Sequence, residues 1–131
     1  ISLKARLSFR RAVLWKITGG LTGMTVNELV NAGFEAITLP EPERELSGVY
    51  IGDLLSWVMG RAQAGNAWIT IMSNVNVAAV ASLADVGCVI LAEDVSADKE
   101  LSDAAESRGI NLLKSKSAAY ETAVKLSLLG I

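Results

Sequence analysis

The sequence predicts a three-layer α/β/α single domain with a mainly parallel central sheet of about four to five strands. Short apolar segments alternate with segments of helical periodicity, and helices of about 10–13 residues between strands are typical of βαβ units. Hydrophobic residues make up 51% of the 131 residues and charged residues 20%. This high apolar content agrees with a parallel sheet that helices cover on both faces.

The first predicted elements form a helix, a strand and a loop. Thr25 is a candidate N-cap with Glu28 three residues later, a pattern that starts a short helix ending near Gly33. Residues 34–39 alternate in hydrophobicity and predict a strand. A charged loop with two prolines follows it, which we expect to be solvated.

Two strand–helix units come next. Residues 49–51 predict a short strand, after which Asp53 is a candidate cap for a helix over 54–64. Residues 67–72 predict the next strand, and Ser73 or Asn74 a cap for a helix that ends at about Asp85 and is closed by Gly87. The remaining expected elements are a buried strand at 88–91, a helix at 97–108 ended by Gly109, a strand at 110–113 and a helix at 117–129.

Charge divides the chain into two segments at a glycine-rich stretch, residues 19–23. Residues 1–23 carry five basic and no acidic side chains, whereas residues 24–131 carry the other seven basic residues and all 14 acidic ones, a net charge of −7. Three interpretations of the basic N-terminal extension stay open. It is a vector-derived or upstream appendage with Met24 as the natural start, a helical arm, or a segment that binds nucleic acid or membrane.

Catalytic residue types are scarce. The chain has no histidine and a single cysteine, Cys88, which lies in an apolar run and is expected to be a buried thiol in the cytoplasm. The apolar stretch 77–92 is too short and too often interrupted to cross a membrane. We therefore expect no metal, no cofactor and no membrane partner, and the acidic segment 24–131 should repel nucleic acid.

Four blocks stand in a fixed order: GVYIGDLLS at 48–56, WIT at 68–70, NVAAVASL at 76–83 and the C-terminal segment 119–131. Together they resemble the DRTGG-domain family, which is similar to the N-terminal domain of HPr kinase/phosphorylase. The resemblance covers residues 24–131. The string that names the family is absent, and EDVS at 93–96 follows the buried strand instead.

The resemblance implies a regulatory domain that acts through a partner enzyme or kinase. An HPr-type kinase needs a phosphate loop, and neither Lys114 nor Lys116 has a glycine at the spacing this loop requires. We therefore predict a protein that is not an enzyme. The function that the resemblance favours is ligand sensing, with an adenine nucleotide or another phosphorylated metabolite as the ligand.

The candidate ligand-binding residues follow two of the predicted strands. In parallel α/β sheets, ligands bind beyond the carboxyl ends of strands, near helix N-termini. Asp53 occupies such a position, as do Ser73, Asn74 and Asn76, although ordinary helix capping explains the same residue types. Glu93 and Asp94 follow a third strand, where a solvated turn is expected rather than a cation site.

The alternative function is that of an interaction or assembly domain without a small ligand. Trp68 lies on a predicted buried strand and should belong to the core. Trp57 lies beside the apolar stripe of its helix, and an exposed tryptophan is a good interface anchor. Trp57 is therefore the candidate interface residue of a homodimer.

Overall fold

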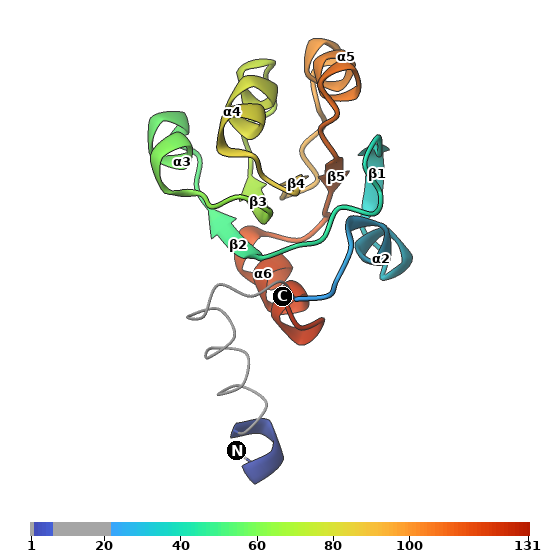
Figure 1. Cartoon of the computed structure of the whole chain (residues 1–131), viewed down its shortest axis with the longest axis vertical. Helices are drawn as coiled ribbons and strands as arrows, with labels where there is room; N and C mark the ends of the chain where they lie inside the picture. Colours follow the sequence, from blue (N-terminus) through green and yellow to red (C-terminus); the bar gives the residue numbers. More distant parts are fainter. Residues whose placement is uncertain (1, 7–21) are drawn as a thin grey trace.

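In the computed structural model, which describes residues 2–6 and 22–131, one sheet of five strands lies between two layers of helices (Figure 1). The strand order is β1-β5-β4-β3-β2. The elements in chain order are α2 (Val26–Asn31), β1 (Glu35–Thr38), β2 (Gly48–Ile51), α3 (Leu55–Arg61), β3 (Asn66–Thr70), α4 (Asn76–Ala84), β4 (Cys88–Leu91), α5 (Lys99–Arg108), β5 (Leu112–Lys114) and α6 (Ala119–Leu128).

Four of the five strands are parallel. β2, β3, β4 and β5 pair in parallel, whereas β1 pairs antiparallel with β5 and places Glu35 opposite Lys114. The carboxyl ends of β2 to β5 therefore meet at one edge of the sheet, together with the amino end of β1. We call this side of the sheet the carboxyl edge.

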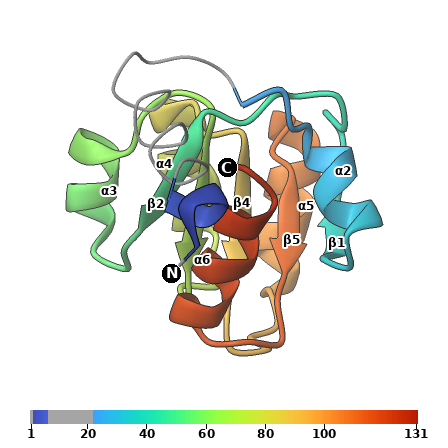
Figure 2. The same ribbon diagram turned by 90° about the horizontal axis from the view of Figure 1, so that it is seen from below.

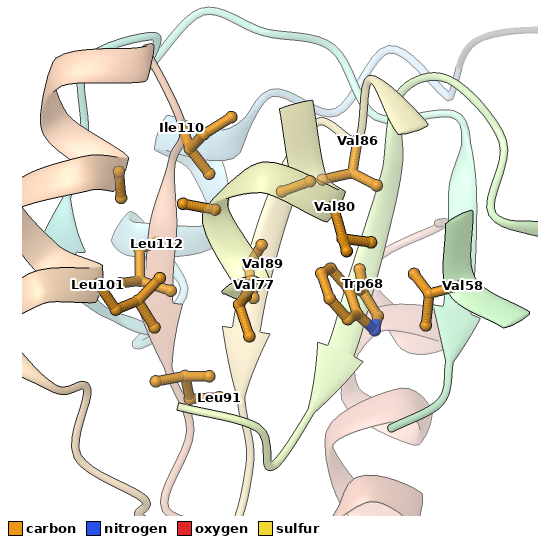
Figure 3. Packing of buried hydrophobic residues seen from close by; sticks show 13 residues of the cluster. Val58, Trp68, Val77, Val80, Val86, Val89, Leu91, Leu101, Ile110 and Leu112 are labelled. Atoms are coloured by element: carbon orange, nitrogen blue, oxygen red, sulfur yellow. The ribbon is translucent and has the colours of Figure 1, made fainter. Parts of the chain in front are cut away.

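Helices α3, α4 and α5 cover one face of the sheet (Figure 1). Trp68 of β3, Val89 and Leu91 of β4 and Leu112 of β5 are fully buried beneath them. Figure 3 shows these strand residues facing Val77, Val80 and Leu101 of the helices. This layer forms one of the two clusters of the core.

Helices α2 and α6 cover the opposite face, with α2 close to β1 and α6 across the middle of the sheet (Figure 2). The alternate residues of the same strands, among them Ile69, Cys88 and Ile90, pack here against Leu29 and Leu126. Because both faces are covered, β3 and β4 are buried along their whole length. The predicted three-layer fold is confirmed.

Some local predictions were wrong. The helix predicted over 54–64 is only Leu55–Arg61, and of its expected apolar stripe only Val58 is buried. Helix α4 ends at Ala84, and its C-cap is Asp85, which adopts the left-handed conformation at φ 54°, so Gly87 does not close the helix. Gly87 instead lies where a Cβ atom would come within 2.7 Å of Leu46 and 2.9 Å of the Gly65 carbonyl.

The expectation for residues 1–23 falls largely outside the described residues. Within the described part, residues 3–6 form a single helical turn with exposed side chains. Thr22 already belongs to the packed structure, because its amide and its hydroxyl both donate to the Leu46 carbonyl, at 3.1 and 2.7 Å. Across the described ranges, no helix is long and apolar enough to cross a membrane.

Candidate functional site

Asp53 fastens the loop after β2 to the end of β3. Its Oδ1 atom accepts hydrogen bonds from the Thr70 hydroxyl at 2.8 Å and from the Ile71 amide at 3.0 Å. The prediction that Asp53 caps the next helix was therefore wrong, and α3 begins after Leu54 without a side-chain cap. The Thr70 hydroxyl is buried, and a buried hydroxyl without an acceptor is unfavourable. The Asp53 carboxylate therefore bonds to Thr70 and not to the start of the helix.

The other three predicted ligand residues lie in the loop after β3 and at the first position of α4. Asn74 Oδ1 accepts from the Asn76 amide at 3.0 Å, a local turn contact. The N-cap of α4 is Val75, without a side-chain cap, so the predicted cap by Ser73 or Asn74 was wrong. Ser73 contributes its carbonyl, which accepts from the Asp98 amide at 3.1 Å. Ser73 and Asn74 are half-buried, and Asn76 is exposed. The fold thus brings all three residues together, next to the loop that holds Asp53.

The two tryptophans of the candidate region have the environments predicted for them. Trp68 is fully buried, and its indole N–H donates to the Gly52 carbonyl at 2.8 Å. Trp57 on α3 is 53% exposed, and the guanidinium of Arg61 lies 3.7 Å from the centre of its ring. One face of the exposed indole is therefore stacked against a cation.

The loop after β4 has an unusual backbone. Glu93 and Asp94 both adopt left-handed backbone conformations, with φ of 61° and 57°, which residues other than glycine rarely adopt. Their amides donate to the carbonyls of Ser117 and Ser115, at 2.8 and 2.9 Å. Asp94 also pairs with the Lys114 amine at 3.1 Å. Among the described residues, no group of three potential metal ligands gathers here or elsewhere.

The loop after β5 folds around its own hydroxyl groups. The Ser115 and Thr122 hydroxyls lie 2.8 Å apart, and the Ser117 amide donates to Ser115 Oγ at 3.2 Å. Thr122 is 1% exposed, so α6 holds this loop through a buried contact. Residues 115–117 are consequently fixed between α6 on one side and the loop after β4 on the other.

A pocket of about 270 Å³ opens beside this loop, between the start of β1, the end of β5 and the first turns of α6. We call it the lysine pocket, because three lysines line it with three hydroxyl side chains. Its lining residues are Gly33, Phe34, Glu35, Lys114, Ser115, Lys116, Ser117, Thr122 and Lys125.

Sequence reasoning missed the lysine pocket. It weighed Lys114 and Lys116 only as part of a phosphate loop, which they do not form. The available signal was the alternation KSKS at 114–117 directly after a predicted strand. Lys125 and Gly33 reach the pocket only through the fold, since the antiparallel pairing of β1 with β5 brings residues 33–35 there.

Cys88 carries no reactive thiol in the folded state. It is fully buried in the core beneath α2 and α6, and burial raises its pKa from 9.0 to about 12. A thiol with this pKa is protonated at neutral pH and is a poor nucleophile. The predicted buried cysteine is therefore confirmed.

The chain is similar to a solved structure of a regulatory region. This structure is the CBS and DRTGG domains of the regulatory region of Clostridium perfringens pyrophosphatase, complexed with its activator, diadenosine tetraphosphate. The TM-score is 0.62 at 17% sequence identity, and the match covers 80% of this chain and 46% of that chain. This likeness establishes a shared fold. No protein-family model and no curated protein matches the chain.

Proposed function

We propose that this chain is a non-catalytic regulatory domain that binds an adenine nucleotide or another phosphorylated metabolite and acts through a partner enzyme or kinase. The ligand lies at the carboxyl edge, where Asp53, Ser73, Asn74 and Asn76 are the candidate contacts. The fold supports this proposal, because it is shared with a regulatory region that was solved with a nucleotide activator.

The observation that carries the proposal is that hydrogen bonds join all four loops of the carboxyl edge. Asp53 joins the loop after β2 to the end of β3. The Ser73 carbonyl joins the next loop to Asp98, ahead of α5. The amides of Glu93 and Asp94 join the loop after β4 to the loop after β5. A ligand bound at one loop is therefore connected to the other loops through these hydrogen bonds, and this connection supports a sensing role.

Thermal unfolding of the full chain with nucleotides and phosphorylated metabolites tests the proposal. A ligand at about 100 times its dissociation constant stabilises the folded state by about 2.7 kcal/mol, which raises the melting temperature measurably. Replacing Ser73 and Asn76 together with alanine should abolish the shift. The matched control replaces Ser82 and Asn27, which lie on α4 and α2 away from these loops, and should keep it.

Two results contradict the proposal. One is a chain whose melting temperature no nucleotide or phosphorylated metabolite changes. The other is turnover of such a ligand by the purified chain, which would make the domain an enzyme.

The second candidate function is assembly into a homodimer without a small ligand. The exposed apolar side chains of α3 and the residue before it favour this function, because Leu54 and Trp57 are 59% and 53% exposed. Light scattering should then show a dimer at tens of micromolar, and Trp57→Ala should return it to a monomer. Trp57→Phe keeps an aromatic ring at this position and is the matched control.

A further inference from the structure

The lysine pocket concentrates positive charge on an acidic domain. Residues 24–131 contain only seven basic side chains against 14 acidic ones, and three of the seven line this single pocket. Lysines that serve only to solvate the surface are expected to be spread over the domain and not gathered in one pocket. Like charges at close range cost free energy unless an anion offsets them. The pocket therefore has the charge of a site for an anionic ligand.

Two of the three lysines have no anionic partner in the described part of the chain. Lys116 and Lys125 form no ion pair there. The Lys125 amine lies 4.5 Å from the centre of the Phe34 ring and close against Gly33, where a Cβ atom would stand 3.2 Å from it. A glycine at this position, with φ of 112°, leaves room for the amine at the pocket wall.

The third lysine, Lys114, already forms an ion pair with a carboxylate. Lys114 is 17% exposed and pairs with Asp94 at 3.1 Å, so an anion in the pocket has to compete with Asp94 for it. Glu35 is the one acidic side chain in the lining, which leaves lysines in excess. Beside them, the exposed Ser117 supplies a hydroxyl that can donate a further hydrogen bond.

The size of the pocket limits the ligand group that fits. Sites that enclose a whole drug-sized ligand measure roughly 300–1,000 Å³. A pocket of about 270 Å³ is smaller and open to solvent, so it suits one charged group rather than a whole nucleotide. Ammonium groups and hydroxyls are a suitable donor set for phosphate oxygens.

We propose that the lysine pocket binds the phosphate or diphosphate group of a small phosphorylated ligand, through Lys114, Lys116, Lys125 and Ser117. This inference rests on the proposed function, because it assigns the part of the carboxyl edge that recognises the phosphates. The remainder of the ligand then lies outside the pocket along the same edge.

Titration of the full chain with inorganic pyrophosphate, followed by calorimetry and by amide NMR shifts, tests the pocket directly. Pyrophosphate should shift the amides of Lys116 and Ser117. Replacing Lys116 and Lys125 together with glutamine should weaken binding by about tenfold or more, since each removes a charge-assisted contact. The control replaces Lys99 and Arg108 on α5 with glutamine, which removes the same charge outside the pocket and should change binding by less than about twofold.

A gain of affinity provides a second test that loss of folding cannot imitate. Asp94→Asn removes the carboxylate that competes for Lys114, and asparagine tolerates the left-handed backbone at this position. Pyrophosphate should then bind about threefold tighter or better, because the lysine loses a competing anion.

The results separate the pocket from the proposed function. The pocket proposal is overturned if the pocket and α5 variants weaken pyrophosphate binding equally, or if the wild type does not bind pyrophosphate. If a nucleotide fails to bind the Ser73 and Asn76 variant but still binds the lysine variant, the pocket proposal fails and the proposed function stands. Pyrophosphate binding at the pocket, with no response to any nucleotide or metabolite, keeps the pocket and overturns the proposed ligand.

Discussion

The contact between Asp53 and the end of β3 should contribute measurably to stability. Asp53→Ala removes the acceptor of two hydrogen bonds, from the Thr70 hydroxyl and the Ile71 amide. Thr70 is 2% exposed, so water does not readily replace the lost carboxylate at its hydroxyl. Ile71 is exposed, and its amide can bond to solvent instead.

The magnitude follows from this difference in burial. A buried donor left without its acceptor costs about 1–3 kcal/mol, whereas a donor that water can reach costs much less. We therefore expect Asp53→Ala to lower the free energy of unfolding by about 2 kcal/mol, most of it from Thr70. For a domain of this size, that corresponds to a fall in melting temperature of about 8 °C.

A double-mutant cycle measured by urea unfolding isolates the contact. Asp53→Ala, Thr70→Ala and the double variant should give a coupling free energy of about 1–2 kcal/mol. Thr70→Ser is the matched control, because it keeps the hydroxyl and should retain most of the coupling.

A coupling near zero would refute the assignment of Asp53 to Thr70. The aspartate would then act locally on α3, as the sequence predicted. The coupling is zero when Asp53→Ala lowers the free energy of unfolding by the same amount in the wild-type chain and in the Thr70→Ala variant.

Three further predictions concern the stability of the same domain. Because burial raises the pKa of Cys88 from 9.0 to about 12, the folded state keeps a proton that the unfolded state loses above pH 9. The free energy of unfolding should fall by about 1.4 kcal/mol per pH unit between 9 and 12 from this group, and urea unfolding of Cys88→Ala should lack that component. Gly87→Ala should cost about 1–3 kcal/mol, because its Cβ would lie 2.7 Å from Leu46; calorimetric melting no lower than that of the wild type would contradict the overlap. Thr25→Ala should cost about 1 kcal/mol by removing the cap on the Glu28 amide, and Thr25→Ser should cost little in the same melting assay.

The layered fold was predictable because its signals are local. Each buried strand is a short apolar run bounded by turn residues, and Cys88–Leu91 is buried at every position as such a run predicts. The antiparallel direction of β1 was not predictable in this way. It depends on the pairing of Glu35 with Lys114, which lie far apart in the sequence.

The same limit applies to the predicted site residues, because their contacts with distant segments could not be predicted from the sequence. Aspartate after a strand and before a helix predicts a cap, yet Asp53 bonds to Thr70 on the neighbouring strand. Asn74 bonds to the Asn76 amide two residues later, a local contact, but the N-cap of α4 is Val75 and the predicted cap by Ser73 or Asn74 was wrong. The KSKS alternation at 114–117 is a local signal for the lysine pocket, but the pocket as a whole depends on three segments that meet only in the folded chain.

The two candidate regions of the carboxyl edge differ in what they offer a ligand. Around Asn74 and Asn76 the groups are carboxamides and amides, which recognise hydrogen-bonding edges, and the one carboxylate beside them, Asp53, accepts hydrogen bonds from Thr70 and Ile71. The lysine pocket offers cations and hydroxyls, which recognise phosphate oxygens. Between them stands the strained loop of Glu93 and Asp94, bonded to the pocket loop on one side and leading to Asp98, which bonds to Ser73, on the other. Under the two proposals above, a phosphorylated molecule with an uncharged polar end would contact both regions, and the hydrogen bonds of the Glu93–Asp94 backbone would connect its two binding regions.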